Sequence, residues 1–71
     1  MHETAKRHWN CSYFSLSGAR ANATFASVQQ AKRFAEGHAG LEASPARWVQ
    51  TERGWLLRLI TAEYIVTPAV P

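Results

Sequence analysis

The stretch FASVQQAKRFAEGHAG, residues 25–40, decides the fold, because it carries the one unmistakable helical pattern of the chain. Ser27 is followed three residues later by Gln30, a capping-box pattern in which each side chain bonds the backbone N–H of the other residue. Gly37 and Gly40 supply positions where a helix can stop. A helix of about ten residues does not persist alone in water, so it must pack on something else.

The helix predicted over about residues 27–38 has one apolar face, and the size of the residues on that face indicates the kind of surface on which the helix packs. Ala31 and Ala35 are small enough for close approach to a flat surface, which favours a sheet beneath the helix. We expect Phe34 to be the anchor of the core. At 100° per residue the apolar face comprises Val28, Ala31, Phe34, Ala35 and His38.

Two strands are predicted before the helix. In HWNCSYFSL, residues 8–16, Trp9, Cys11 and Tyr13 fall on one side and Phe14 and Leu16 on the other. Ser17–Gly18 is a turn signal, because glycine tolerates the positive φ of tight hairpins. ARANATF, residues 19–25, then alternates small apolar and polar residues, as a half-buried strand does, although its alanines also suit a helix.

Three strands are predicted after the helix. A connector, LEASP, leads to ARWVQ, residues 46–50, and a turn at Arg53–Gly54 precedes WLLRLIT, residues 55–61. YIVTP, residues 64–68, closes the ladder, which Pro68 ends. The order is β-β-α-β-β-β, an α+β fold with one antiparallel sheet of four to five strands and one helix on one face.

Length and composition predict a single small domain over residues 1–71, with residues 1–7 and 68–71 as loose tails. The chain is 46% hydrophobic and 18% charged, which is globular rather than disordered. A lone cysteine cannot form an internal disulfide, the N-terminus lacks an apolar signal core, and no apolar run approaches a membrane span. We therefore expect a cytoplasmic protein without membrane contact.

The polar residues carry no recognisable catalytic or metal motif. His2, His8, Cys11 and His38 lack the spacings typical of zinc sites. Cys11 with His8 or His38 resembles a thiol and base, but in an alternating strand a buried packing role is the commoner one. We expect no metal, no cofactor, no small-molecule substrate and no enzyme activity.

The strand over residues 55–61 points to a contact surface instead, because both of its faces are apolar. One helix covers one face of a sheet, so the other face is left to a partner or to a second copy of the chain. We expect this contact face to centre on Leu56, Arg58 and Ile60, with Trp48 or Tyr64 beside them. The competing interpretation is that strand curvature and the chain ends hide these side chains.

A second functional hypothesis comes from interleaved basic and aromatic residues. The net charge is +3, and Arg47, Trp48, Arg53 and Arg58 combine the cations and rings that stacking platforms for single-stranded nucleic acid use. The basic residues are otherwise scattered along the chain, as on a solvated surface. Nucleic acid is therefore the alternative partner, behind protein.

The layout of two strands, a helix opening SVQQAKRFA and the closing segment RWVQTERGWLLRLITAEYIVT resembles certain small phage-encoded anti-CRISPR proteins. The likeness covers residues 9–67 in layout and about seven helix residues in sequence. It implies a protein from a phage or mobile element that blocks a surface of a larger complex, such as a CRISPR effector, without catalysis. Acidic mimicry of DNA, one strategy of such inhibitors, does not fit a chain of charge +3.

Overall fold

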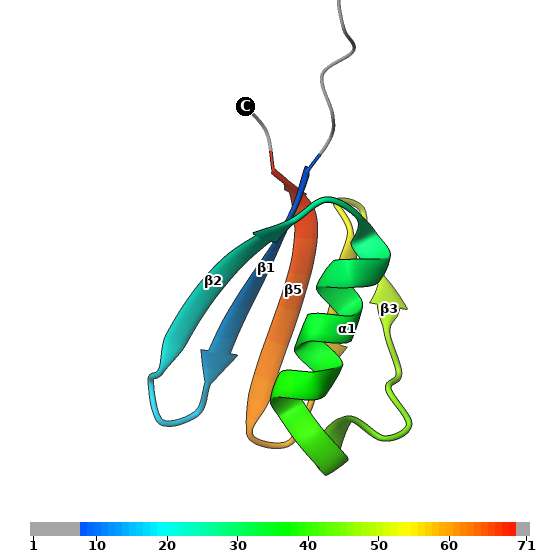
Figure 1. Ribbon diagram of the computed structural model, residues 1–71. Coiled ribbons are helices and arrows are strands. Elements are labelled where there is room, and N and C mark those ends of the chain that lie inside the picture. Colours follow the sequence, from blue (N-terminus) through cyan, green and yellow to red (C-terminus); the bar gives the residue numbers. More distant parts are fainter. Residues whose placement is uncertain (1–7, 70–71) are drawn as a thin grey trace, which may run out of the picture.

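The computed structural model describes residues 8–69, except for the side chains of residues 41 and 42. The predicted tail at 1–7 and the last two residues of the tail predicted at 68–71 therefore lie outside the described residues. One sheet carries one α-helix on one face (Figure 1). This confirms the predicted α+β fold. The elements are β1 (His8–Ser15), β2 (Arg20–Phe25), α1 (Val28–Ala39), a 3-10 turn (Gly40–Ala43), β3 (Val49–Gln50), β4 (Trp55–Arg58) and β5 (Ala62–Ala69).

The sheet is antiparallel throughout and has the strand order β2-β1-β5-β4-β3. The central strand, β5, and its neighbour β1 come from opposite ends of the described chain and pair along their whole length, from His8–Ala69 to Ser15–Ala62. Helix α1 connects the two edge strands, β2 and β3, so it has to cross the sheet. The face that it crosses becomes the core.

The helix begins as its sequence predicts and ends slightly differently. The Ser27 hydroxyl accepts from the Gln30 N–H at 3.1 Å, whereas the Gln30 side chain accepts from the Ala26 N–H at 3.3 Å rather than from Ser27. Gly40 caps the C-terminus with φ +72°, in the region that favours glycine. Gly37 is not a stop position but lies within the helix, because its backbone keeps the helical conformation.

The core lies where the helix approaches the sheet most closely. Ala31 and Ala35 are fully buried. The sheet residues buried beneath them are Cys11, Leu57, Tyr64 and Val66. These four residues all lie on the side of their strands that the alternation assigns to the helix.

Phe34 is not the core anchor that the sequence suggests, because 38% of it is exposed. The alanines face the sheet directly. At 100° per residue Phe34 lies outside the narrow arc between them, on the side of Ala31, so its side chain is turned to one flank. There the Phe34 ring packs on Phe25 of β2, with ring centroids 5.1 Å apart. Phe34 thus covers the side of the core rather than filling its centre.

The closing strands differ from the prediction in length. β3 has two residues and β4 ends at Arg58, whereas β5 begins earlier than expected, at Ala62. Pro68 does not end the ladder: it lies within β5 opposite Trp9, and Ala69 pairs with His8, so the chain does not loosen at residue 68. Proline is tolerated there because β4 stops pairing at Val66 and leaves that side of β5 without a strand neighbour among the described residues.

Glycine is required at two places, by the backbone conformation of one turn and by a close approach between strands at the other. Gly18, with φ +96°, completes the β1–β2 turn, in which its N–H donates to the Ser15 carbonyl at 3.0 Å. Gly54 begins the return of the chain into β4, and a Cβ there would overlap the Val66 carbonyl of β5. A side chain at residue 54 would push β4 away from the central strand.

Truncating Leu57 should destabilise the protein far more than truncating Phe34. Leu57 is 1% exposed, so Leu57→Ala should lower the unfolding free energy by about 2–5 kcal/mol, as in other cores. Phe34→Ala should cost less than this, because the Phe34 ring is partly solvated in the folded state. Urea unfolding followed by tryptophan fluorescence measures both values. A larger loss for Phe34→Ala would place the centre of the core on the helix flank.

Candidate functional site

No helix among residues 8–69 covers the face of the sheet opposite α1, and the strand register arranges the side chains of this face in rows. One row crosses all five strands and changes from polar to apolar along its length. The next row, towards the β1–β2 turn, is mainly charged. The first row consists of Asn22, Ser12, Ile65, Leu56 and Val49, and the second of Arg20, Phe14, Glu63 and Arg58.

Beyond the charged row, two hairpin turns lie side by side at the same end of the sheet. The Leu16 N–H, in the β1–β2 turn, donates to the Thr61 carbonyl, in the β4–β5 turn, at 2.9 Å. Each turn exposes one large aliphatic side chain, Leu16 at 81% and Ile60 at 85%. We call Leu16 and Ile60, together with the half-exposed Phe14, the apolar tip.

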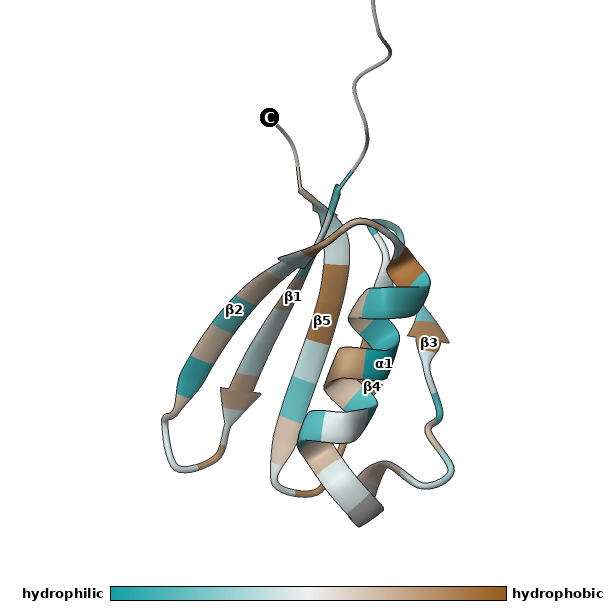
Figure 2. Cartoon of the chain, viewed as in Figure 1, coloured by the Kyte–Doolittle hydropathy of each residue, from teal (hydrophilic) through white to brown (hydrophobic). Residues whose placement is uncertain are grey.

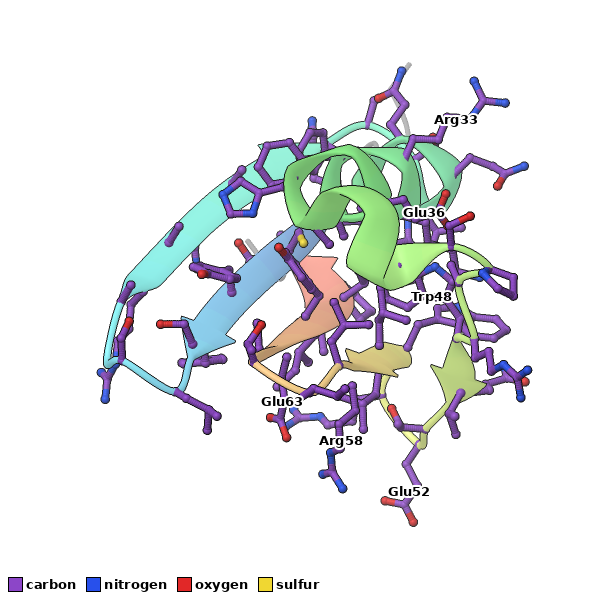
Figure 3. The ribbon with its side chains drawn as sticks, turned by 90° about the horizontal axis from the view of Figure 1, so that it is seen from below. Arg33, Glu36, Trp48, Glu52, Arg58 and Glu63 are labelled. Atoms are coloured by element: carbon purple, nitrogen blue, oxygen red, sulfur yellow. The ribbon has the colours of Figure 1, made fainter. Side chains whose placement is uncertain are left out.

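The apolar tip surrounds a shallow hollow that also contains a charged pair. A depression of about 480 Å³ is lined by all three tip residues and by Arg58 and Glu63. The Arg58 Nε donates to Glu63 Oε2 at 2.9 Å, and both side chains point away from the helix (Figure 3). The pair is solvated, so it contributes little to stability, but it fixes a cation and an anion beside exposed apolar surface.

Three of the predicted contact residues lie where the sequence placed them. Leu56 and Arg58 are on the uncovered side of the sheet, because Leu57, between them, is buried under the helix. Ile60 lies beyond β4, in the β4–β5 turn, where it lines the same hollow as Arg58. The alternation in β4 therefore confirms which side of this strand is open. That these residues contact a partner stays a prediction.

The placement of Tyr64 on the open face is wrong. Tyr64 is 1% exposed and lies beneath the helix, where the register pairs it with Leu57. Its hydroxyl bonds His38 Nδ1 at 2.6 Å, and its ring lies 5.1 Å from that of Tyr13. Both faces of β5 carry apolar residues, so only the register could assign Tyr64 to the core.

Trp48 also lies on the helix side, away from the apolar tip. Its indole N–H donates to Glu36 of α1 at 2.8 Å (Figure 3). Lys32 lies above the same region, with its ammonium 3.4 Å from the ring centroid of Trp55 and 5.7 Å from that of Trp48. These contacts tie the segment before β3 to the helix and leave Trp48 no part in the open face.

The alternative nucleic-acid set is not gathered into one platform. Arg47 and Arg58 line a common hollow of about 250 Å³ beside Ile60. Arg53 lies at the other end of β4, in the turn before it. Trp48 is on the opposite side of the sheet from Arg58. The one aromatic ring of this set, that of Trp48, is therefore not beside Arg58.

Sequence reasoning missed the contribution of the β1–β2 turn. The alternation placed Phe14 and Leu16 on the side of their strand opposite Trp9, Cys11 and Tyr13, but neither was expected to join the contact face. The available signal was Leu16, a hydrophobic residue in a turn that otherwise contains serine and glycine. Its meaning depends on Ile60, which only the folded chain brings beside Leu16.

The thiol and the histidines do not form a reactive site in the described part of the chain. Residues 8–69 contain no group of three or more His, Cys, Asp or Glu side chains that could hold a metal ion. Burial raises the pKa of the Cys11 thiol to about 11, whereas a nucleophilic cysteine needs a lowered pKa. Cys11 therefore acts as a small hydrophobic residue of the core.

Comparison with known proteins gives no family to which these features can be related, since neither a family model, nor a curated protein, nor a solved structure matches the chain. Within residues 8–69, no helix combines the length and the apolar character needed to cross a membrane. Assignment of a function therefore depends on the geometry of the chain itself.

Cys11 should make the stability of the protein depend on pH in the alkaline range. Because the pKa is about 11 in the folded state and 9.0 in a free thiol, the folded state favours the protonated form. The contribution of protonated Cys11 is complete below pH 9 and is lost as the pH rises towards 11. Unfolding measured at several pH values should show a steeper alkaline loss for the wild type than for Cys11→Ala. Parallel curves for the two proteins would contradict the raised pKa.

Proposed function

We propose that this chain is a non-catalytic protein-binding module that contacts its partner through the apolar tip and the adjacent Arg58–Glu63 pair. The observation that carries the proposal is the pairing of two turns that expose Leu16 and Ile60 side by side. Large aliphatic side chains exposed to this extent cost solvation free energy, and such groups usually mark contact surfaces.

The composition of the surface supports a protein partner. Its centre is apolar and aromatic, through Ile60, Leu16 and Phe14, and its charges lie at the margin, as in many protein interfaces. Arginine is enriched in interface hot spots because its planar guanidinium donates several hydrogen bonds to a carboxylate. Arg58 donates one hydrogen bond to Glu63, from Nε, so a partner carboxylate can join or replace that contact.

The kind of complex follows from the resemblance to small anti-CRISPR proteins. We propose that the chain, encoded by a phage or another mobile element, acts in the cytoplasm by blocking a surface of a larger assembly such as a CRISPR effector. A chain of 71 residues with an exposed apolar tip is suited to such occupation of a surface. Its charge of +3 favours contact with protein rather than imitation of DNA.

Two substitutions at the surface should weaken binding without unfolding the protein. Ile60→Ser and Arg58→Glu should each reduce partner affinity about tenfold or more, as truncation of interface hot spots does. Affinity capture from the native host with mass spectrometry identifies the partner, and calorimetry with the purified partner measures the affinities. Arg33→Glu is the matched control, because it makes the same charge change on the outer side of the helix (Figure 3).

Two outcomes would count against this function. Equal affinity of Ile60→Ser, Arg58→Glu and the control for the identified partner would exclude the apolar tip as the contact. Tight binding of single-stranded DNA or RNA that falls steeply as salt is added would instead favour the nucleic-acid alternative, because phosphate contacts release counterions. We expect no such binding even at low salt.

A further inference from the structure

The two edges of the sheet differ in their protection against pairing with another strand. β3 at one edge has two residues and follows Pro45 closely. β2 at the other edge has six residues, Arg20–Phe25, with no proline, no lysine and one charged side chain at its start. Natural proteins usually shorten, charge or interrupt a free edge. β2 lacks these features and is open to pairing.

The register shows which backbone groups of β2 are free. The Ser15 N–H donates to the Ala19 carbonyl at 3.0 Å, so this is a hydrogen-bonded pair of the β1–β2 hairpin. Hydrogen-bonded and non-hydrogen-bonded pairs alternate along an antiparallel ladder. The alternate residues Arg20, Asn22 and Thr24 therefore direct their N–H and C=O groups away from β1. No other strand among residues 8–69 pairs with that edge.

The helix does not obstruct this edge. In Figure 1, α1 lies over the half of the sheet that is away from β2, and the outer edge of β2 is free. Figure 2 shows the apolar and polar bands that alternate along β2. On the helix side of the strand Ala21 is exposed, and no described element covers it.

On the helix side of β2 the side chains become larger along the strand, and this order is complementary to an antiparallel copy of the same strand. Its residues increase from small, at Ala21 and Ala23, to large, at Phe25, whose ring extends towards Phe34. In an antiparallel pair centred on Ala23, each Phe25 lies opposite the Ala21 of the other copy. The large side chain of one copy then fills the space beside the small side chain of the other.

The same alignment suits the charges and the polar face. Asn22 of one copy lies opposite Thr24 of the other, where two small polar side chains meet, and each Arg20 lies opposite Ala26. Direct contact between the two Arg20 side chains, which would be repulsive, occurs only in a different register. We propose that β2 pairs with β2 of a second copy of this chain, forming a two-fold dimer with a continuous ten-stranded sheet.

Both helices would lie on one face of the continuous sheet, because the two-fold axis is perpendicular to it. The two apolar tips would lie at opposite ends of the joined strands, so the dimer presents two copies of the proposed contact surface. Such a dimer binds a repetitive assembly bivalently. The pairing itself does not involve Leu16 or Ile60, so it does not depend on the proposed function.

The proposal is tested with two double variants that change only the charges across the new pair of strands. Asn22→Lys/Thr24→Glu places opposite charges across the two-fold axis, and Asn22→Lys/Thr24→Lys places like charges there. Sedimentation over roughly a thousandfold range of concentration should give a dimer for the wild type and for the first variant. The second should dissociate about tenfold more readily, because two unfavourable pairs form by symmetry. A wild type that stays monomeric, or equal dissociation of both variants, would overturn the proposal.

Hydrogen exchange of the wild type gives an independent result if a variant fails to fold. The amides of Asn22 and Thr24 should be protected at high protein concentration and should exchange rapidly at low concentration. The amides of Ala21 and Ala23, which face β1, should be protected at both. Fast exchange at Asn22 and Thr24 at every concentration would exclude β2 pairing, whatever the outcome of the partner-binding measurements.

Discussion

The structure depends on the close contact of two alanines, Ala31 and Ala35, with the sheet. Because neither side chain extends beyond a methyl group, α1 approaches the sheet closely enough to bury Tyr64, Leu57, Val66 and Cys11 beneath it. A larger residue at either position would raise the helix and open the core. In a domain this small, no other element among the described residues can compensate for such a loss.

This contact also explains the asymmetry of the molecule. The single helix covers one face, so no other element among residues 8–69 covers the opposite face or either edge. Helix side chains on either side of this contact pack at the margin of the core, where Phe34 packs on Phe25 and the Lys32 ammonium lies over the Trp55 ring. The position of the alanine contact therefore determines which surface of the sheet the helix leaves uncovered.

The two proposed interactions use different parts of that surface. The apolar tip consists of side chains held in place by two adjoining turns, and it relies on hydrophobic and charged contacts. The β2 edge offers backbone hydrogen bonds, with side chains that adjust the register. A chain that uses both would bind its partner as a symmetric pair, with the helix remaining a structural element in each copy.

The sequence by itself determined the α+β class, the position of the helix and its Ser27 cap, and the inward side of β4. These features depend on local periodicity and on neighbouring residues, which a single chain displays directly. The sequence did not determine that Tyr64 and Trp48 belong to the helix side, that β5 continues through Pro68, or that Phe34 lies on the flank. Each of these depends on pairing between distant segments. The apolar tip is the clearest case, because Leu16 and Ile60 are 44 residues apart and become neighbours only when the central pairing of β1 with β5 brings their two turns together.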